Sequence, residues 1–323
     1  MKKAAKLLTI KRTELMPDIC AAVFLFFYYF SVFGRFGQKF AAAVAISVGT
    51  GLLLGFFRIL FNFSGKDTND FFSGRFGWLL FFAFPLFFPL SLSLWLIPFV
   101  LVSAYLICFG AFGGFKNHFF NPVILAVIFM MCGYGYTSVL NVSRPLPVNS
   151  GYKTWTSGIP VSKPLWKIYA SVPLESAVKA SVSSHLPSVP GASRGAVILL
   201  FSLLFSFIFK RRRLWVIGCV CFTVLFSYLI THFVFEPALG IKSFYPLLFG
   251  FVPIMLFVGV YDFETISQGR FDQLAASLIF SFFAVMFSFN TENVYLPVYA
   301  FLIMQILTPL ISDIKAMFVK AAK

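Results

Sequence analysis

Charged residues are scarce in this sequence, and their scarcity excludes most classes of soluble protein. Asp, Glu, Lys and Arg make up 11% of the 323 residues, whereas an average soluble domain contains about 25%. So small a charged fraction cannot cover a water-exposed surface, and a disordered chain would carry fewer hydrophobic residues. Hydrophobic residues make up 59% of the chain, and Phe alone occupies 47 positions. The sequence therefore predicts an integral membrane protein.

Potential metal ligands and redox motifs are also few. The chain has three His and five Cys residues, without a Cys-x-x-Cys pair and without paired His spacing. The cysteines lie within or beside apolar runs, where they act as small apolar side chains. There is no G-x-G-x-x-G motif either. The sequence thus favours neither a metal centre, a disulfide framework nor a nucleotide-binding loop, and we assign no catalytic residue and no metal ligand.

Long apolar runs are abundant, and they define the expected fold. A spanning helix needs about 20 mostly apolar residues, or roughly 17 when it is tilted or packed. We expect an all-α membrane protein with about ten transmembrane helices, in one polytopic domain covering residues 1–323. The expected windows are 16–33, 40–57, 77–91, 94–111, 121–138, 195–209, 214–232, 244–261, 273–289 and 294–312.

The distribution of Lys and Arg predicts the orientation of these helices. With a cytoplasmic N-terminus, the segments expected inside hold seventeen Lys and Arg. The short segments expected outside hold three, namely Arg35, Lys39 and Lys242. The positive-inside rule applies to short loops, so we expect both termini in the cytoplasm. We therefore interpret the net charge of +15 as an orientation signal rather than a sign of nucleic-acid binding.

We expect residues 139–194 to form a long periplasmic loop between the fifth and sixth expected helices. The loop is rich in Ser, Pro, Val and Lys and contains Trp155, Trp166 and Tyr169. Loops above about 15 residues without regular structure are usually functional or disordered. The aromatic residues favour docking or interfacial packing over disorder.

Ten helices divide into five plus five, and an odd number in each half gives the halves opposite orientations. Such inverted repeats often interrupt equivalent helices near the middle of the membrane. The third window contains Pro85 and Pro89, and the eighth contains Pro253 and Gly259. We therefore expect a 5+5 inverted repeat with broken third and eighth helices.

The segment from Phe112 to Pro122, between the fourth and fifth windows, is the sharpest local motif. Glycine allows a tight turn or close approach of a neighbour, Asn caps freed amides, and Pro suits the first turn of a helix. We take five residues as its functional positions: Gly113, Gly114, Asn117, Asn121 and Pro122.

This segment closely resembles the signature of the D subunit of Rnf-type ion-translocating electron-transport complexes. That family also includes the B subunit of the sodium-pumping NADH:quinone reductase. Four further stretches resemble the family in the same order: Val172-Pro173-Leu174-Glu175, Val189-Pro190-Gly191, Asp262 with Gly269-Arg270, and residues 302–311.

The resemblance implies a membrane subunit of an ion-translocating oxidoreductase in the bacterial inner membrane. Members of the family belong to multi-subunit complexes that couple electron transfer from ferredoxin or NADH to Na⁺ or H⁺ transport. The expected partners are therefore the lipid bilayer and the other membrane and periplasm-facing subunits. The family's D subunit also carries FMN, phosphodiester-linked to a threonine on the periplasmic side.

The sequence departs from the family at the flavin site. Alignment on Pro173-Leu174-Glu175 places Val172 at the flavin-bearing threonine, and valine has no hydroxyl to esterify. Ser171 lies one residue away and lacks the flanking motif, so it is a poor substitute. We predict that covalent FMN is absent, which leaves non-covalent flavin or no flavin as the alternatives.

Two other functions remain open from the sequence. An inverted repeat with broken third and eighth helices also resembles urea-channel architecture, which would suit a small-solute channel or carrier. A flavin-less scaffold subunit that holds redox partners together is the other alternative. Asp18 and Asp262 are the acids near helix ends in positions that could face the interior, and acids at membrane depth are often functional.

Overall fold

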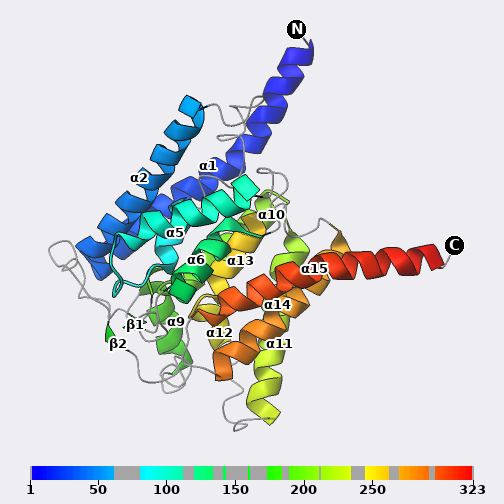
Figure 1. Ribbon diagram of the computed structural model, residues 1–323. Coiled ribbons are helices and arrows are strands. Elements are labelled where there is room, and N and C mark those ends of the chain that lie inside the picture. The colour runs from blue at the N-terminus through cyan, green and yellow to red at the C-terminus, as the bar shows by residue number, and fades with distance from the viewer. Residues whose placement is uncertain are drawn as a thin grey trace.

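A computed structural model gives the fold and describes most of the chain (Figure 1). The described residues are 2–61, 81–111, 120–133, 141–142, 159–160, 173–183, 189–210, 212–233, 244–261, 269–290 and 295–321. They are overwhelmingly helical. Within them, the β-structure is one two-residue antiparallel ladder between β1 (Asn141–Val142) and β2 (Ile159–Pro160).

Among the described residues, four helices are long and apolar enough to cross a membrane. They are α1 (Lys2–Phe36), α2 (Gln38–Phe61), α11 (Arg213–Phe233) and α14 (Arg270–Asn290). Their apolar stretches are 20 or 21 residues long, which matches the thickness of a bilayer at 1.5 Å per residue. The fold is therefore that of a membrane-embedded helical protein.

The described part of the chain holds five further apolar helices, which are shorter or only partly apolar. They are α5 (Leu96–Tyr105), which continues as the π-helix η2 (Leu106–Ala111), α6 (Pro122–Gly133), α10 (Gly195–Ile208), α13 (Val252–Tyr261) and α15 (Leu296–Ala321). The helices α1 and α15 extend beyond the apolar windows at 16–33 and 294–312. Hydropathy cannot detect such extensions because their residues are polar or mixed.

Helical geometry is interrupted in the windows 77–91 and 244–261. In the first, the chain passes into a 3-10 turn, η1 (Phe84–Phe87), and has no further helix before Leu96. In the second, α12 (Tyr245–Leu248) stops before Gly250, whose φ is +78°, and α13 then begins. Proline near each interruption lacks the N–H group that a continuous helix would use.

Pairs of side chains give the relative directions of the packed helices. The helices α1 and α10 are antiparallel, because Phe24 stacks on Phe201 at 3.6 Å between ring centroids while Tyr28 reaches Pro190. The helices α10 and α13 are parallel, since Phe201 lies near Phe257 and Phe205 lies near Tyr261.

The helices α11 and α14 are also parallel, and small polar residues line their contact. Gly218 lies against Ser277, and one turn further along Thr223 donates to Ser281 at 3.1 Å. Ser281 in turn donates to the carbonyl of Cys219 at 3.2 Å. Small residues let two membrane helices approach closely, and hydroxyl groups then bond across the contact.

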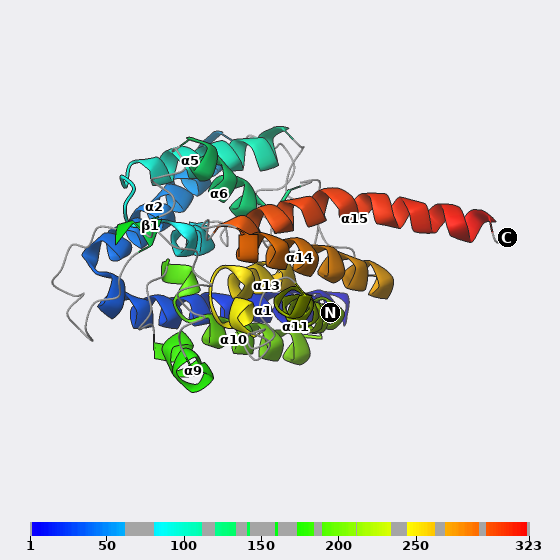
Figure 2. The ribbon, with the colours of Figure 1, turned by 90° about the horizontal axis from the view of Figure 1, so that it is seen from below.

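The described elements of residues 139–194 gather at one end of the bundle. They are β1, β2, α9 (Leu174–Ser183) and the 3-10 turn η4 (Pro190–Ala192). Ala177 and Ala180 of α9 pack against Tyr245 and Phe249. Figure 1 shows β1, β2 and α9 at the end opposite the two chain termini, and Figure 2 shows the same for β1 and α9.

Candidate functional site

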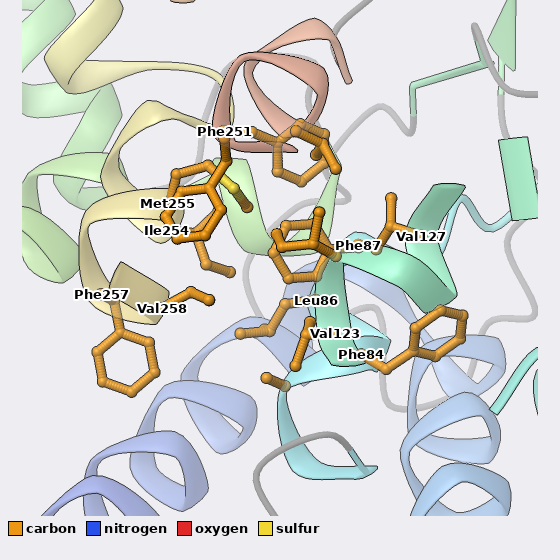
Figure 3. Packing of buried hydrophobic residues seen from close by; sticks show 14 of the residues in the cluster. Phe84, Leu86, Phe87, Val123, Val127, Phe251, Ile254, Met255, Phe257 and Val258 are labelled. Carbon is orange, nitrogen blue, oxygen red and sulfur yellow. The ribbon is translucent and has the colours of Figure 1, made fainter. Parts of the chain in front are cut away.

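The two interrupted segments meet in the middle of the protein, at a cluster that we call the central crossing. It consists of Phe84–Phe87, Val189–Ala192, Phe251–Ile254 and Tyr295. Phe87 stacks on Phe251 with 5.2 Å between ring centroids, and Phe251 lies 4.7 Å from Tyr295. These residues are all buried. Figure 3 shows apolar side chains of η1, α6 and α13 filling the space between the segments.

Tyrosine and serine hydroxyl groups bind backbone carbonyls at the central crossing. The Tyr295 hydroxyl donates to the carbonyl of Phe87 at 2.8 Å. The carbonyl of Pro190 accepts from Tyr28 at 3.0 Å and from Ser193 at 2.8 Å. Non-helical backbone buried in a membrane protein must find such partners, because hydrocarbon supplies none. These hydroxyl groups therefore supply hydrogen bonds to buried carbonyl groups of the non-helical backbone.

Gly191 allows the closest backbone approach at the crossing. A Cβ atom at this position would lie 2.6 Å from the carbonyl oxygen of Leu86 and 3.0 Å from Cδ1 of Ile254. Any larger residue would push η4 away from η1. The Val189-Pro190-Gly191 stretch, which carries part of the family resemblance, thus has a physical role in joining residues about 100 positions apart.

The chemistry available at the central crossing is limited. Tyr295 is the one titratable side chain among the residues that define it, and its hydroxyl is engaged with Phe87. The crossing thus offers neither a general acid–base pair nor a nucleophile. Its aromatic and aliphatic packing instead fixes two segments from different parts of the chain against each other.

Asn121 forms a second buried contact between distant segments. As the sequence predicts, it caps α6: its Oδ1 accepts from the amides of Val123 at 2.9 Å and Ile124 at 3.3 Å, and Pro122 is the first residue of the helix. The amide of Asn121 also donates to Oε1 of Gln305 in α15 at 3.4 Å. Both polar side chains are buried, so this end of the motif joins α6 to α15.

Asp18 in α1 accepts a hydrogen bond from α13, the helix that follows the interruption at Gly250. The Tyr261 hydroxyl, at the end of α13, donates to Oδ1 of Asp18 in α1. Tyr261 is fully buried and Asp18 is partly buried. A carboxylate near a membrane boundary is stabilised by such a donor. Asp262, the other acid singled out from the sequence, lies outside the described residues.

The other predicted site residues also lie outside the described residues. These are Gly113, Gly114, Asn117, Ser171 and Val172. Conversely, the sequence analysis missed Tyr28, Tyr295 and Gln305, which bond to carbonyl or amide groups across the protein. The signal that could have identified Gln305 is an isolated amide side chain within a spanning window. Tyrosine gives no such signal in a chain this rich in aromatic residues.

Comparison with models of known protein families and with curated proteins finds no match for this sequence.

Proposed function

We propose that the chain crosses the membrane ten times, as two five-helix halves of opposite orientation. The nine apolar helices within the described ranges and the interrupted segment 81–95 would supply the ten crossings. The two halves have matching neighbours. The second and fourth crossings pack together in the first half (α2 on α5), as do their equivalents, the seventh and ninth, in the second half (α11 on α14). The fourth and fifth crossings (α5 on α6) likewise match the ninth and tenth (α14 on α15). Two copies of one helical arrangement would produce this pattern.

Contacts between equivalent elements support the same arrangement. The first and sixth crossings meet through Phe24 and Phe201, and the third and eighth meet through Phe87 and Phe251. The fifth and tenth are joined by the bond between Asn121 and Gln305. An element beside a two-fold axis contacts its own equivalent, so these three contacts are expected for two halves related by such an axis.

The directions of the helices also agree with ten crossings. Crossings of equal parity must run the same way, and the pairs α10–α13 and α11–α14 are parallel. The antiparallel pair α1–α10 joins crossings of opposite parity. An even number of crossings returns the chain to its starting side, and both termini lie at the same end of the bundle in Figure 2.

The function that we propose is that of a membrane subunit in an Rnf-like complex, which couples electron transfer to Na⁺ or H⁺ transport in a bacterial inner membrane. The observation that carries this proposal is the location of Gly191 and Asn121. Both belong to stretches that carry the family resemblance, and both make buried contacts between the two halves. The resemblance thus coincides with positions where the architecture constrains the sequence.

FMN does not fit its family attachment point in this chain. Val172 offers no hydroxyl for a phosphodiester bond, so we propose that the subunit carries non-covalent flavin or none. Its own residues would then contribute the scaffold for neighbouring redox subunits, held rigid by the central crossing.

A small-solute channel of urea-channel-like architecture is the weaker alternative. In such a channel the crossing of the broken segments would have to admit a polar solute. Here Phe87, Phe251 and Tyr295 fill that position and are buried. Dense aromatic packing of this kind argues against a hydrophilic passage through the middle of the protein.

Affinity purification of the tagged chain from its native membranes in mild detergent tests the proposed function. We expect further membrane subunits to co-purify, with flavin or iron–sulfur absorption that is bleached by a reductant. An untagged strain serves as the control. Purification of the chain without redox partners, together with solute flux in proteoliposomes, would instead support a channel.

A further inference from the structure

One flank of the helix α9 packs against the rest of the protein. Ala177, Ala180 and Ser181 lie on this flank and are buried. The two alanines pack against Tyr245 and Phe249, and the helix contacts both α10 and α12. Because three small side chains form this flank, the backbone of α9 lies close to its neighbours.

The exposed side of α9 is divided into an apolar part and a charged part. Leu174, Val178 and Val182 are 39%, 42% and 48% exposed. Their positions, four residues apart, cover an arc of about 80° around the helix. Glu175 and Lys179 occupy the next arc, where they form an exposed ion pair at 2.6 Å. Single exposed apolar residues are common on proteins, but isolated exposures would not be sorted into one arc in this way.

The apolar arc lies between the buried flank and the ion pair, and we call it the α9 stripe (Leu174, Val178 and Val182). Around the helix, buried protein contacts are followed by the stripe and then by the charged side chains. A helix at the edge of a membrane meets protein, lipid and water in this same order. A helix surrounded by water on its whole exposed side would favour polar residues at all of these positions.

The position of α9 in the bundle agrees with such surroundings. The helix lies at the end opposite the chain termini (Figure 1) and contacts α10. Gly195, the first residue of α10, packs directly against the carbonyl of Leu248, which also packs against the α9 cluster. Further along α10, the exposed side chains include Leu200 and Leu204. Because an apolar helix with such an outer face begins beside α9, this is the level at which the lipid begins.

We propose that α9 is an interfacial helix whose stripe inserts into the lipid bilayer. Leu174, Val178 and Val182 lie at the boundary between lipid headgroups and acyl chains, while the Glu175–Lys179 pair stays in water. The stripe is aliphatic and uncharged, so its partner is the bilayer itself and no particular headgroup is needed. The proposal requires a membrane-embedded protein and does not rest on the proposed redox function.

Fluorescence quenching of the full-length chain in lipid nanodiscs tests this placement. The exposed Cys132 and Cys221 are replaced by Ala, and the labelled parent protein gives the background. A bimane fluorophore is attached at Val178→Cys on the stripe and, in a separate protein, at Lys179→Cys on the charged side. One quencher is phosphatidylcholine with a nitroxide on its acyl chain close to the headgroup, and the other is iodide in the buffer.

The two labels should respond in opposite ways. We expect the lipid nitroxide to quench the label at residue 178 about twofold more strongly than the label at residue 179, because an interfacial helix buries its apolar face below the headgroups. Iodide should quench residue 179 more strongly. Val182→Cys takes the place of Val178→Cys if that variant does not fold. Equal lipid quenching at the two positions would overturn the proposal. A label on the stripe that neither quencher reaches would also overturn it, because protein would then cover the stripe.

Discussion

At the scale of single residues, the protein depends on positions where backbone segments nearly touch. Gly191 brings η4 against Leu86, the Tyr295 hydroxyl binds the Phe87 carbonyl at the end of η1, and the Tyr28 hydroxyl binds the Pro190 carbonyl of η4. Each of these residues contacts the backbone of a distant segment. Their substitution therefore affects how two segments meet, which a change on the lipid-facing surface would not do.

Gly191→Ala tests the close approach at the central crossing. The added Cβ would lie 2.6 Å from the Leu86 carbonyl oxygen, and relief of this overlap should cost ~1–3 kcal/mol of folding free energy. We expect a lower Tm in detergent. The matched control is Gly49→Ala in α2, where no heavy atom lies within 4 Å of the new Cβ. It should leave Tm unchanged or raise it slightly. Equal effects of the two substitutions would contradict this role of Gly191.

Val172 provides a second test at this scale, based on the sequence. Because valine has no hydroxyl, we expect the chain to remain non-fluorescent on a denaturing gel after co-expression with a flavin transferase. A fluorescent band that survives denaturation would refute this prediction. Loss of such a band in Ser171→Ala would then identify Ser171 as the attachment point.

At the scale of elements, the interrupted segments and the cap of α6 determine how the helices are placed. The breaks at η1 and before α13 allow these two distant segments of the chain to meet in the middle of the protein. The Asn121 cap begins α6 beside Gln305 of α15. A continuous helix at either break would separate the aromatic residues that now pack there.

Asn121→Ala tests the side-chain cap of α6 alone, because the contact to Gln305 of α15 is made by the backbone N–H of residue 121 and is retained. The substitution removes the acceptor for the amides of Val123 and Ile124 and should cost about 1 kcal/mol. Asn121→Ser retains a capping oxygen and should recover most of the loss. The measurement is Tm of the purified variants under identical conditions. If Ala and Ser behave alike, the side-chain cap does not contribute to stability.

The sequence predicts the apolar helices better than it predicts their contacts. Length and composition suffice for α2, α11 and α14, because a bilayer imposes both on any spanning helix. The Asn121 cap was also predictable, since its bonds are local. Gln305 and Tyr295 could not be assigned in the same way, because their partners lie about 200 residues away in the sequence.

At the scale of the whole molecule, the account depends on two halves of opposite orientation. The elements that we propose to be equivalent meet at Phe24–Phe201, at Phe87–Phe251 and at Asn121–Gln305. Both termini lie at one end of the bundle, and β1, β2 and α9 lie at the other. The excess of Lys and Arg near the termini then predicts which end faces the cytoplasm.

Reporter fusions at residues 150 and 212 test this orientation most directly. The test uses two kinds of reporter protein, one that is active only outside the membrane and one that is active only in the cytoplasm. Each kind is fused at residue 150 and, in a separate protein, at residue 212. We predict that residue 150 reports outside and residue 212 reports the cytoplasm, because one crossing separates them. Reports from the same side at both positions would contradict the ten crossings and the inverted halves.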